Sequence, residues 1–287
     1  MTRLSRRSLL RAAALSPVAS LPAFAAHSLS SIGVQIYTVR NVILKDPAAT
    51  LNAIAALGYH EAEVIAGTIP KIWSALQASN LKPVSMHADT AIFFPGKEKE
   101  LDDAIALAKS HGFEYIVFPY LPPNQRGDAA VYHKLAQTLN AAGRKVSAAG
   151  LHLCYHNHAF EFQPMDGTMP LEIMMKETDP TLVSLEMDVF WVSVAGHNPV
   201  EMLHKYSKRV ALLHLKDKAQ GFPVQYNENV PPSTFREVGH GSLDFPAILK
   251  AAQSTHVKHY FVEQDQTPGD PIASLRRSID YLRALQF

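Results

Sequence analysis

The sequence is short of cysteine and of net charge. Cys154 is the only cysteine among 287 residues, so the chain cannot form an internal disulfide. Because Cys154 lies within an apolar run, we expect a buried packing role rather than a nucleophile. The 27 lysines and arginines nearly balance 26 aspartates and glutamates, giving a formal charge of +1 without a basic stripe. A nucleic-acid partner is therefore not expected.

The first 26 residues have the pattern of an export signal. Arg6 and Arg7 are followed by Leu-Leu, a modestly apolar stretch and the small-residue pattern Ala-Phe-Ala at positions 23–25. The paired arginines resemble the twin-arginine signal of bacteria. The apolar stretch contains two prolines and is shorter than the roughly 20 residues that span a bilayer, which argues against a stable membrane anchor. We expect residues 1–26 to direct export to the periplasm and residues 30–287 to form one domain.

Strand-like and helix-like segments alternate along the rest of the chain, as in βα units with a parallel sheet. The expected strands cover residues 32–38, 60–65, 83–87, 115–119, 146–156, 182–188, 210–216 and 259–263. The expected helices include residues 48–57, 98–110, 129–142, 246–252 and 272–285. Gly58, Gly112 and Gly143 follow three of these helices, as glycines that end helices do.

Eight such units in about 260 residues predict an α/β fold, a closed (β/α)8 barrel. The alternative is an open doubly wound sheet, but no glycine-rich phosphate turn follows the first expected strand. The longest interruption covers residues 217–244 and contains Pro223, Pro231 and Pro232. Because it follows the seventh strand, we expect it to project over the mouth of the barrel, where it could act as a lid.

Polar side chains gather at the carboxyl ends of the expected strands, where barrel enzymes place their active residues. In chain order they are Gln35, Tyr37, Glu63, His87, Tyr120, His156, His158, Glu186, Asp188, His214, Lys216, Glu263 and Asp265. The period of two along a strand puts the paired residues on one strand face, inside the barrel. Burying so many ionisable groups is costly unless a metal or a substrate offsets the cost.

Four of these side chains each end a different apolar run, namely His156, Asp188, His214 and Glu263. Two imidazoles and two carboxylates suit one divalent ion such as Mn²⁺, Co²⁺, Zn²⁺ or Fe²⁺. Protein ligands on one side of an ion leave positions free for substrate oxygens. The sequence therefore predicts an open metal site at the mouth of the barrel.

Several segments resemble the xylose isomerase-like TIM barrel superfamily and, within it, the sugar phosphate isomerase/epimerase group. These segments are residues 33–40, 155–162, 185–191, 213–217, 237–241 and 261–266. The resemblance covers nearly all of the chain after the export signal, and its motifs are specific for the superfamily rather than for a substrate. It implies a single divalent ion held by one residue from each of strands five to eight. Asp188, His214 and Glu263 match the usual ligands of the last three strands.

The chain departs from the family pattern at the fifth strand. The family commonly has a glutamate in a Glu-Asn-His-like context, and His156 stands in its place before Asn157 and His158. The fifth-strand ligand could therefore be His156, His158 or Glu161. In two-base epimerases of the superfamily this glutamate is also one of the two proton-transfer bases. A histidine can take a proton only while the same nitrogen is not bound to the metal.

The resemblance and the residue types imply chemistry at the carbonyl of a carbohydrate. The carbonyl and its neighbouring hydroxyl would chelate the ion, which stabilises the enediolate formed when the α-proton leaves. The predicted catalytic residues, which transfer protons or stabilise an oxyanion, are Glu263, His156, His158, Lys216 and Glu186. The predicted substrate-binding residues are Gln35, Tyr37, Glu63, His87, Glu161 and Trp191. Trp191 could equally pack at the rim of the barrel.

The leading hypothesis is a metal-dependent isomerase or epimerase of a free sugar or keto-sugar. A sugar phosphate is disfavoured because export separates the enzyme from most phosphorylated intermediates and no clear anion cradle is visible. The Gly239-His240-Gly241 segment suggests a tight turn lining the site rather than a phosphate loop.

A lyase or dehydratase of a keto-sugar or 3-keto-glycoside is the first alternative. The enediolate can expel a β-leaving group, and the loss of one carboxylate base at the fifth strand favours elimination. A non-catalytic exported sugar-binding barrel is the second alternative. A nuclease of the related endonuclease IV type would require more metal ligands and a basic face, which a formal charge of +1 does not supply. A homo-oligomer is left open, because such barrels often pair.

Overall fold

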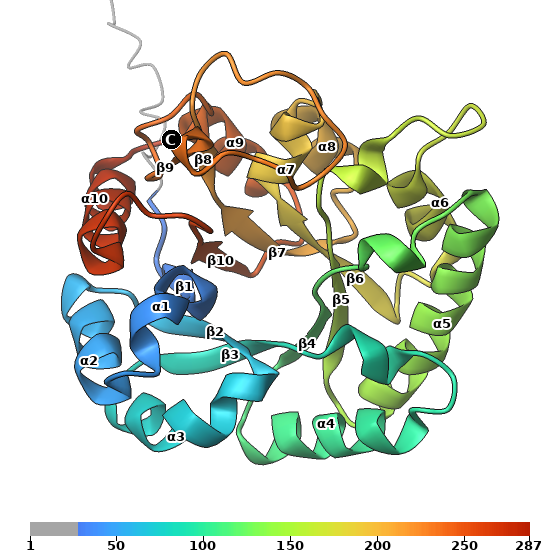
Figure 1. Cartoon of the computed structure of the whole chain (residues 1–287), viewed down its shortest axis with the longest axis horizontal. Helices are drawn as coiled ribbons and strands as arrows, with labels where there is room; N and C mark the ends of the chain where they lie inside the picture. Colours follow the sequence, from blue (N-terminus) through green and yellow to red (C-terminus); the bar gives the residue numbers. More distant parts are fainter. Residues whose placement is uncertain (1–27) are drawn as a thin grey trace, which may run out of the picture.

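Eight parallel strands close into a barrel in the computed structural model, which describes residues 28–287 (Figure 1). Around the barrel the order is β1-β10-β7-β6-β5-β4-β3-β2. The strands are β1 (Gly33–Gln35), β2 (Glu61–Ile65), β3 (Lys82–His87), β4 (Tyr115–Phe118), β5 (His152–His156), β6 (Val183–Asp188), β7 (Val210–Leu215) and β10 (His259–Val262). The predicted (β/α)8 barrel is confirmed.

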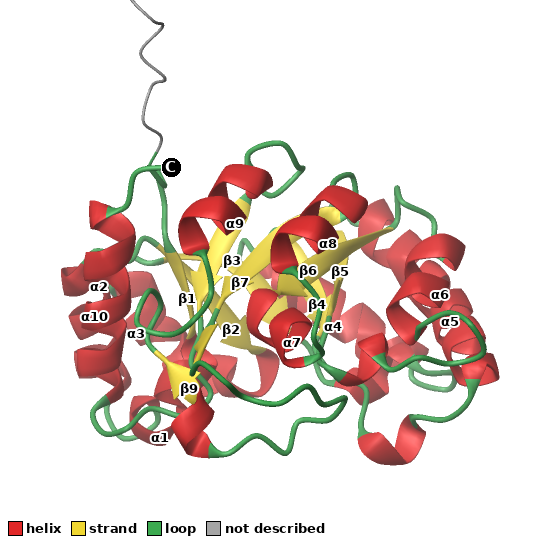
Figure 2. Ribbon diagram, turned by 90° about the horizontal axis from the view of Figure 1, so that it is seen from above, coloured by secondary structure: helices red, strands yellow, loops and turns green. Residues whose placement is uncertain are grey.

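Helices surround the strands on all sides (Figures 1 and 2). They are α1 (Arg40–Ile43), α2 (Pro47–Leu57), α3 (Ile69–Ala78), α4 (Glu98–Ser110), α5 (Ala129–Ala148), α6 (Pro170–Glu177), α7 (Val189–Val194), α8 (Pro199–Lys205), α9 (Phe245–Ala252) and α10 (Pro271–Ala284). Several begin with an acidic cap and a proline. In α2, for example, Asp46 accepts a hydrogen bond from the amide of Ala49, and Pro47 is the first helical residue.

The predicted boundary between the helix at residues 129–142 and the fifth strand is wrong. Helix α5 continues to Ala148, and β5 begins only at His152. Gly143 therefore lies inside the helix instead of ending it. A Cβ atom on Gly143 would come within 2.8 Å of the carbonyl oxygen of Leu182, so this glycine permits a close approach of α5 to the segment before β6. The first strand is also shorter than predicted, because residues Ile36–Val39 form a 3-10 helix.

The apolar core has two parts. The larger one lies between the strands and the helices, and the smaller one includes inward-facing side chains of the barrel strands. The smaller part consists of Val84, Tyr115, Val117, Cys154, Ala211, Leu212 and Phe261. Cys154 is fully buried there, in agreement with a packing role. Polar side chains occupy the next positions toward the carboxyl ends of the strands, as His156 does two residues after Cys154 on β5.

The predicted interruption after the seventh strand forms a small hairpin with a long connection. Strand β8 (Asp217–Lys218) pairs in antiparallel fashion with β9 (Phe235–Arg236), and residues 219–234 join them. The carboxylate of Asp217 accepts hydrogen bonds from the amides of Gly239, Gly241, Ser242 and Leu243. The tight turn that was predicted at Gly239 to Gly241 therefore binds a carboxylate of the chain itself.

The predicted export signal, residues 1–26, lies outside the described residues. Within residues 28–287, no helix is long and apolar enough to cross a membrane.

Candidate metal centre

A pocket of about 450 Å³ opens at the carboxyl ends of the barrel strands. The predicted site residues that line it are Tyr37, His87, His156, His158, Trp191, Lys216 and Glu263. The remaining predicted residues lie deeper, and hydrogen bonds or ion pairs connect them to this lining. The pocket is large enough for a small organic ligand.

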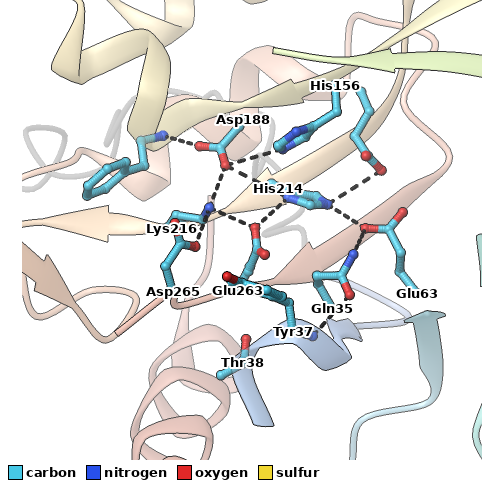
Figure 3. Close-up of polar contacts among 12 residues, drawn as sticks. Gln35, Tyr37, Thr38, Glu63, His156, Asp188, His214, Lys216, Glu263 and Asp265 are labelled. Atoms are coloured by element: carbon cyan, nitrogen blue, oxygen red, sulfur yellow. Dashed lines mark hydrogen bonds and ion pairs between the residues drawn. The ribbon is translucent and has the colours of Figure 1, made fainter. Parts of the chain in front are cut away.

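His156, Asp188, His214 and Glu263 lie together (Figure 3), and His156 and Glu263 of this group line the pocket. Each offers one ligand atom, and the four atoms lie within 4.8 Å of one another. All four residues are more than nine-tenths buried. Within residues 28–287, His156 Nε2 has no hydrogen-bond partner, and Asp188 Oδ2 forms an ion pair with the ammonium of Lys216. Buried polar atoms without partners are costly, so the donor set fits a divalent ion.

Local contacts aim two of these ligand atoms. The Nδ1 atom of His156 lies 3.0 Å from the carbonyl oxygen of Pro119, so it donates there and leaves Nε2 free to face the cluster. Asp188 Oδ1 accepts hydrogen bonds from the amides of Phe190 (2.9 Å) and Trp191 (3.1 Å) at the start of α7. This cap fixes the carboxylate and directs Oδ2 toward the cluster.

The imidazole of His214 joins the cluster to a second, deeper layer. Its Nδ1 atom lies 3.0 Å from Glu263 Oε2, and its Nε2 atom lies 2.7 Å from Glu63 Oε1 (Figure 3). If Nδ1 holds the ion, Nε2 carries the proton and donates it to Glu63. Glu63 is fully buried and also accepts a hydrogen bond from Gln35 Nε2 at 2.8 Å. Glu63 therefore orients His214.

The deeper layer itself pairs two imidazoles with two carboxylates: Glu63, His87, Glu186 and His214. His87 Nε2 lies 2.8 Å from Glu186 Oε2 and 3.0 Å from Glu63 Oε1. Burial alone would lower the pKa of His87, but these two carboxylates raise the pKa to about 10. Gln35, Glu63 and Glu186 are fully buried here and do not line the pocket, and their roles in catalysis and substrate binding stay predictions.

The ammonium group of Lys216 lies against three carboxylates. Its Nζ atom is 2.9 Å from Asp188 Oδ2, 2.7 Å from Glu263 Oε2 and 2.8 Å from Asp265 Oδ1. Burial would lower the pKa of Lys216, but the three carboxylates hold it well above the ordinary value. In return, Lys216 keeps the pKa values of Asp188 and Glu263 low in spite of their burial. Lys216 is therefore a fixed positive charge beside the predicted ligands.

His158 and Glu161 are connected through the main chain. Glu161 Oε2 accepts a hydrogen bond from the amide of His158 at 2.8 Å, and Glu161 Oε1 accepts one from the Tyr155 hydroxyl at 2.7 Å. Burial raises the pKa of Glu161 to about 8, and this residue does not line the pocket. His158 does line it, and its Nδ1 atom has no hydrogen-bond partner in the described chain. The pKa of His158 is lowered, mainly by burial and to a smaller extent by the charges of His156 and Lys216.

Three candidates were open for the fifth-strand ligand, and His156 alone of them belongs to a ligand cluster within residues 28–287. Trp191 is almost fully buried, lies next to the Phe190 ring and also lines the pocket, so both of its predicted roles stay open. Glu228, in the connection between β8 and β9, lines the pocket as well. Glu228 was not predicted from the sequence, because no motif or periodic pattern surrounds it.

The family model for xylose isomerase-like TIM barrels matches residues 51–285. An inosose dehydratase of Clostridium botulinum (strain Alaska E43 / Type E3) is 28% identical over 162 residues, which are 53% of this chain and 54% of that protein. The chain thus spans about half the length of the curated relatives it matches.

Solved structures share the fold over nearly the whole chain. A sugar phosphate isomerase/epimerase from Parabacteroides distasonis ATCC 8503 has a TM-score of 0.74 and 26% identity, covering 89% of this chain and 98% of that chain. The IOLI protein with a bound zinc atom has a TM-score of 0.67 and 17% identity, covering 88% and 98%. The chain belongs to the xylose isomerase-like TIM barrel family.

Proposed function

We propose that this chain is a metal-dependent enzyme that removes the proton next to the carbonyl of an unphosphorylated keto-sugar, with β-elimination as the outcome. The observation that carries the proposal is the cluster of His156, Asp188, His214 and Glu263 below a pocket that His158 and Lys216 also line. A divalent ion held by the four ligands would supply positive charge for the carbonyl oxygen and its neighbouring hydroxyl.

His158 is suited to move the proton. Its unpartnered Nδ1 can accept the proton from the carbon next to the carbonyl. The C–H bonding electrons then form a C=C bond as the bond to the β-oxygen breaks, and His158 returns the proton to the departing oxygen. One residue serves as base and then as acid, so no second base is needed. Lys216 stabilises the negative charge that develops on the carbonyl oxygen.

Epimerisation needs two groups that transfer protons on opposite faces of the substrate. Glu263 and Asp265 line the pocket and are the carboxylates available for this role. Both lie within 2.8 Å of the Lys216 ammonium. Lys216 helps to hold the pKa of Glu263 low, which makes Glu263 a weaker base, whereas burial raises the pKa of Asp265. The presence of two such carboxylates near His158 keeps isomerisation or epimerisation as the second candidate.

The charges around the pocket favour a substrate without phosphate. Within the described part of the chain, no arginine lines the pocket, whereas Glu228, Glu263 and Asp265 do. The positive charge of Lys216 is already matched by three carboxylates. The amide donors of the Gly239 to Leu243 turn are occupied by Asp217, so this turn offers no free anion site.

The relatives' names support both candidates in part. The curated relatives that this chain matches over about half their length are inosose dehydratases, which supports elimination from a ketone-bearing polyol. The Parabacteroides structure is called a sugar phosphate isomerase/epimerase, which supports the second candidate. A non-catalytic sugar-binding barrel would not explain the buried, unpartnered Nε2 atom of His156 beside three other predicted ligands. The Arg6-Arg7 pattern supports export to the periplasm as part of the same proposal.

The test is turnover of an inosose and a 3-keto-glucoside in D₂O by the metal-loaded protein, followed by NMR. Elimination predicts an unsaturated ketone with loss of water or of the aglycone, and His158→Gln should reduce its rate at least about a hundredfold. Deuterium at the α-carbon of a product with unchanged composition would establish the second candidate instead. If protein carrying one ion per chain turns over neither compound, the proposed function is wrong.

A further inference from the structure

We infer that Glu228 forms a subsite for a hydroxyl group on a second ring of the substrate, so that the substrate is a keto-glycoside with a hydroxyl-bearing aglycone. This inference rests on the proposed function, because it concerns the sugar that the same pocket accepts. Glu228 comes from the connection between β8 and β9 and lies in the pocket wall. It belongs to neither cluster of candidate metal ligands.

The two oxygens of the Glu228 carboxylate have different surroundings. Oε2 lies 3.1 Å from Arg126 Nη1 and 3.4 Å from the Tyr120 hydroxyl, and both groups donate to it. Oε1 is buried and has no hydrogen-bond partner among residues 28–287. An unpartnered carboxylate oxygen in the wall of a pocket costs free energy that a donor on a ligand would recover. One oxygen is therefore fixed, and the other is available to a ligand.

Arg126 determines which kind of donor suits this oxygen. Its guanidinium group lies over the Phe160 ring, 3.5 Å from the centroid, and its Nε atom donates to the carbonyl of Leu121 at 2.9 Å. The guanidinium therefore stays in place and neutralises Glu228. Its Nη2 atom is also buried without a partner in the described residues. The free acceptor oxygen of a carboxylate whose charge is already paired suits a neutral donor such as a hydroxyl better than an ammonium or a phosphate.

The order of the aromatic rings places this subsite away from the reacting carbon. The His158 ring lies 4.8 Å from the His156 ring, and the Tyr120 ring lies 4.8 Å from the His158 ring, measured between centroids. Glu228 contacts the hydroxyl of Tyr120. The rings of His158 and Tyr120 thus lie between the metal cluster and Glu228, and all three residues line the same pocket, so a sugar ring bound over the cluster would direct a second ring toward Glu228.

The connection that carries Glu228 is held in place before any ligand binds. The amide of Gln225 donates to the carbonyl of Val194 in α7, at 3.1 Å. The Gln225 side chain donates to the carbonyls of Asn227 and Asn229, on either side of Glu228. Because this connection is already ordered, binding does not lose free energy to ordering it. The hydrogen bond from the substrate to Glu228 therefore contributes to affinity.

The test compares a two-ring and a one-ring substrate, 3-keto-cellobiose and 3-keto-glucose, on the metal-loaded full chain. Glu228→Met should lower kcat/KM for 3-keto-cellobiose about 10- to 100-fold, mostly through KM, because it removes a hydrogen bond to a charged group. The value for 3-keto-glucose should stay within about twofold. Glu228→Gln retains an acceptor oxygen and should recover part of the loss. Glu172→Met, which breaks the exposed Glu172–Lys205 pair, is the matched control.

Calorimetric binding of cellobiose, which carries no keto group, separates the subsite from the chemistry. Wild type should bind cellobiose at least about tenfold more tightly than Glu228→Met at equal thermal stability. If this holds while neither keto-sugar nor an inosose is turned over, the subsite stands and the proposed function fails. If both keto-sugars lose activity equally in Glu228→Met, or neither does, the subsite is wrong and the proposed function stands. If wild type neither binds cellobiose nor turns over either keto-sugar, both fail.

Discussion

The ammonium nitrogen of Lys216 lies 2.7 Å from Oε2 of Glu263, a predicted metal ligand. The same ammonium lies 2.9 Å from Asp188 Oδ2, which belongs to a second predicted ligand. A divalent ion held by the predicted ligands would therefore have this lysine in contact with two of its carboxylates. Positive charges so close repel each other, and the lysine opposes the binding of the ion on which its catalytic role would depend.

Replacing Lys216 with methionine should tighten metal binding while activity falls. A unit charge about 4 Å away contributes on the order of 4 kcal/mol at a protein-like dielectric, so even a partial effect lowers the Kd of the ion at least about tenfold. Competition with a chelator measures this Kd. Lys205→Met, which removes an exposed lysine paired with Glu172, should leave it unchanged. Weaker binding in Lys216→Met would mean that the lysine helps to build the site.

Glu63 should matter for metal affinity although it is not a predicted ligand. Its Oε1 atom lies 2.7 Å from His214 Nε2, so Glu63→Gln weakens the acceptor that orients the imidazole. We expect about a 10- to 100-fold loss of affinity for the ion. Glu61→Gln is a matched control, because Glu61 lies two residues earlier on β2 and contacts a different histidine, His259, at 2.9 Å. Equal losses in both variants would exclude a specific role for Glu63.

Glu161 should make stability depend on pH. Burial raises its pKa to about 8 from an ordinary value of 4.5, so between these values the folded chain holds a proton that the unfolded chain has released. The free energy of unfolding therefore falls as pH rises from about 4.5 to 8, by at most about 1.4 kcal/mol per pH unit. Glu161→Gln should remove this slope, which urea unfolding at pH 5 and pH 8 would measure. An unchanged slope would show that Glu161 is ionised in the folded chain.

Much of the predicted site could be read from the chain because its residues follow apolar strands. His156 and Asp188 are the last residues of β5 and β6. His214 is the second-to-last residue of β7, and Glu263 directly follows β10. Parallel strands of a barrel bring such positions together. The boundary of α5 could not be predicted in this way, because Val146 is apolar and buried in the helix just as it would be in a strand.

The partners of the site residues were harder to predict than their positions. Of the three carboxylates around Lys216, one ends β6 and two follow β10, and their distances depend on the closed barrel. Glu228 belongs to a connection whose apolar residues have neither helical nor strand-like spacing, so the local sequence does not determine the path of the chain. Its place in the pocket wall follows from the hydrogen bonds of that connection and from Arg126.

The most direct test is the metal content of the protein produced from its full sequence, by elemental mass spectrometry, for wild type and His156→Ala. His152→Ala is the control, because His152 lies on the same strand but is exposed at its other end. About one Mn, Co, Zn or Fe per chain is expected in wild type and His152→Ala, with loss in His156→Ala because its Nε2 atom faces the cluster. Full metal content in His156→Ala, or none in wild type, would contradict a metal centre built from these four residues.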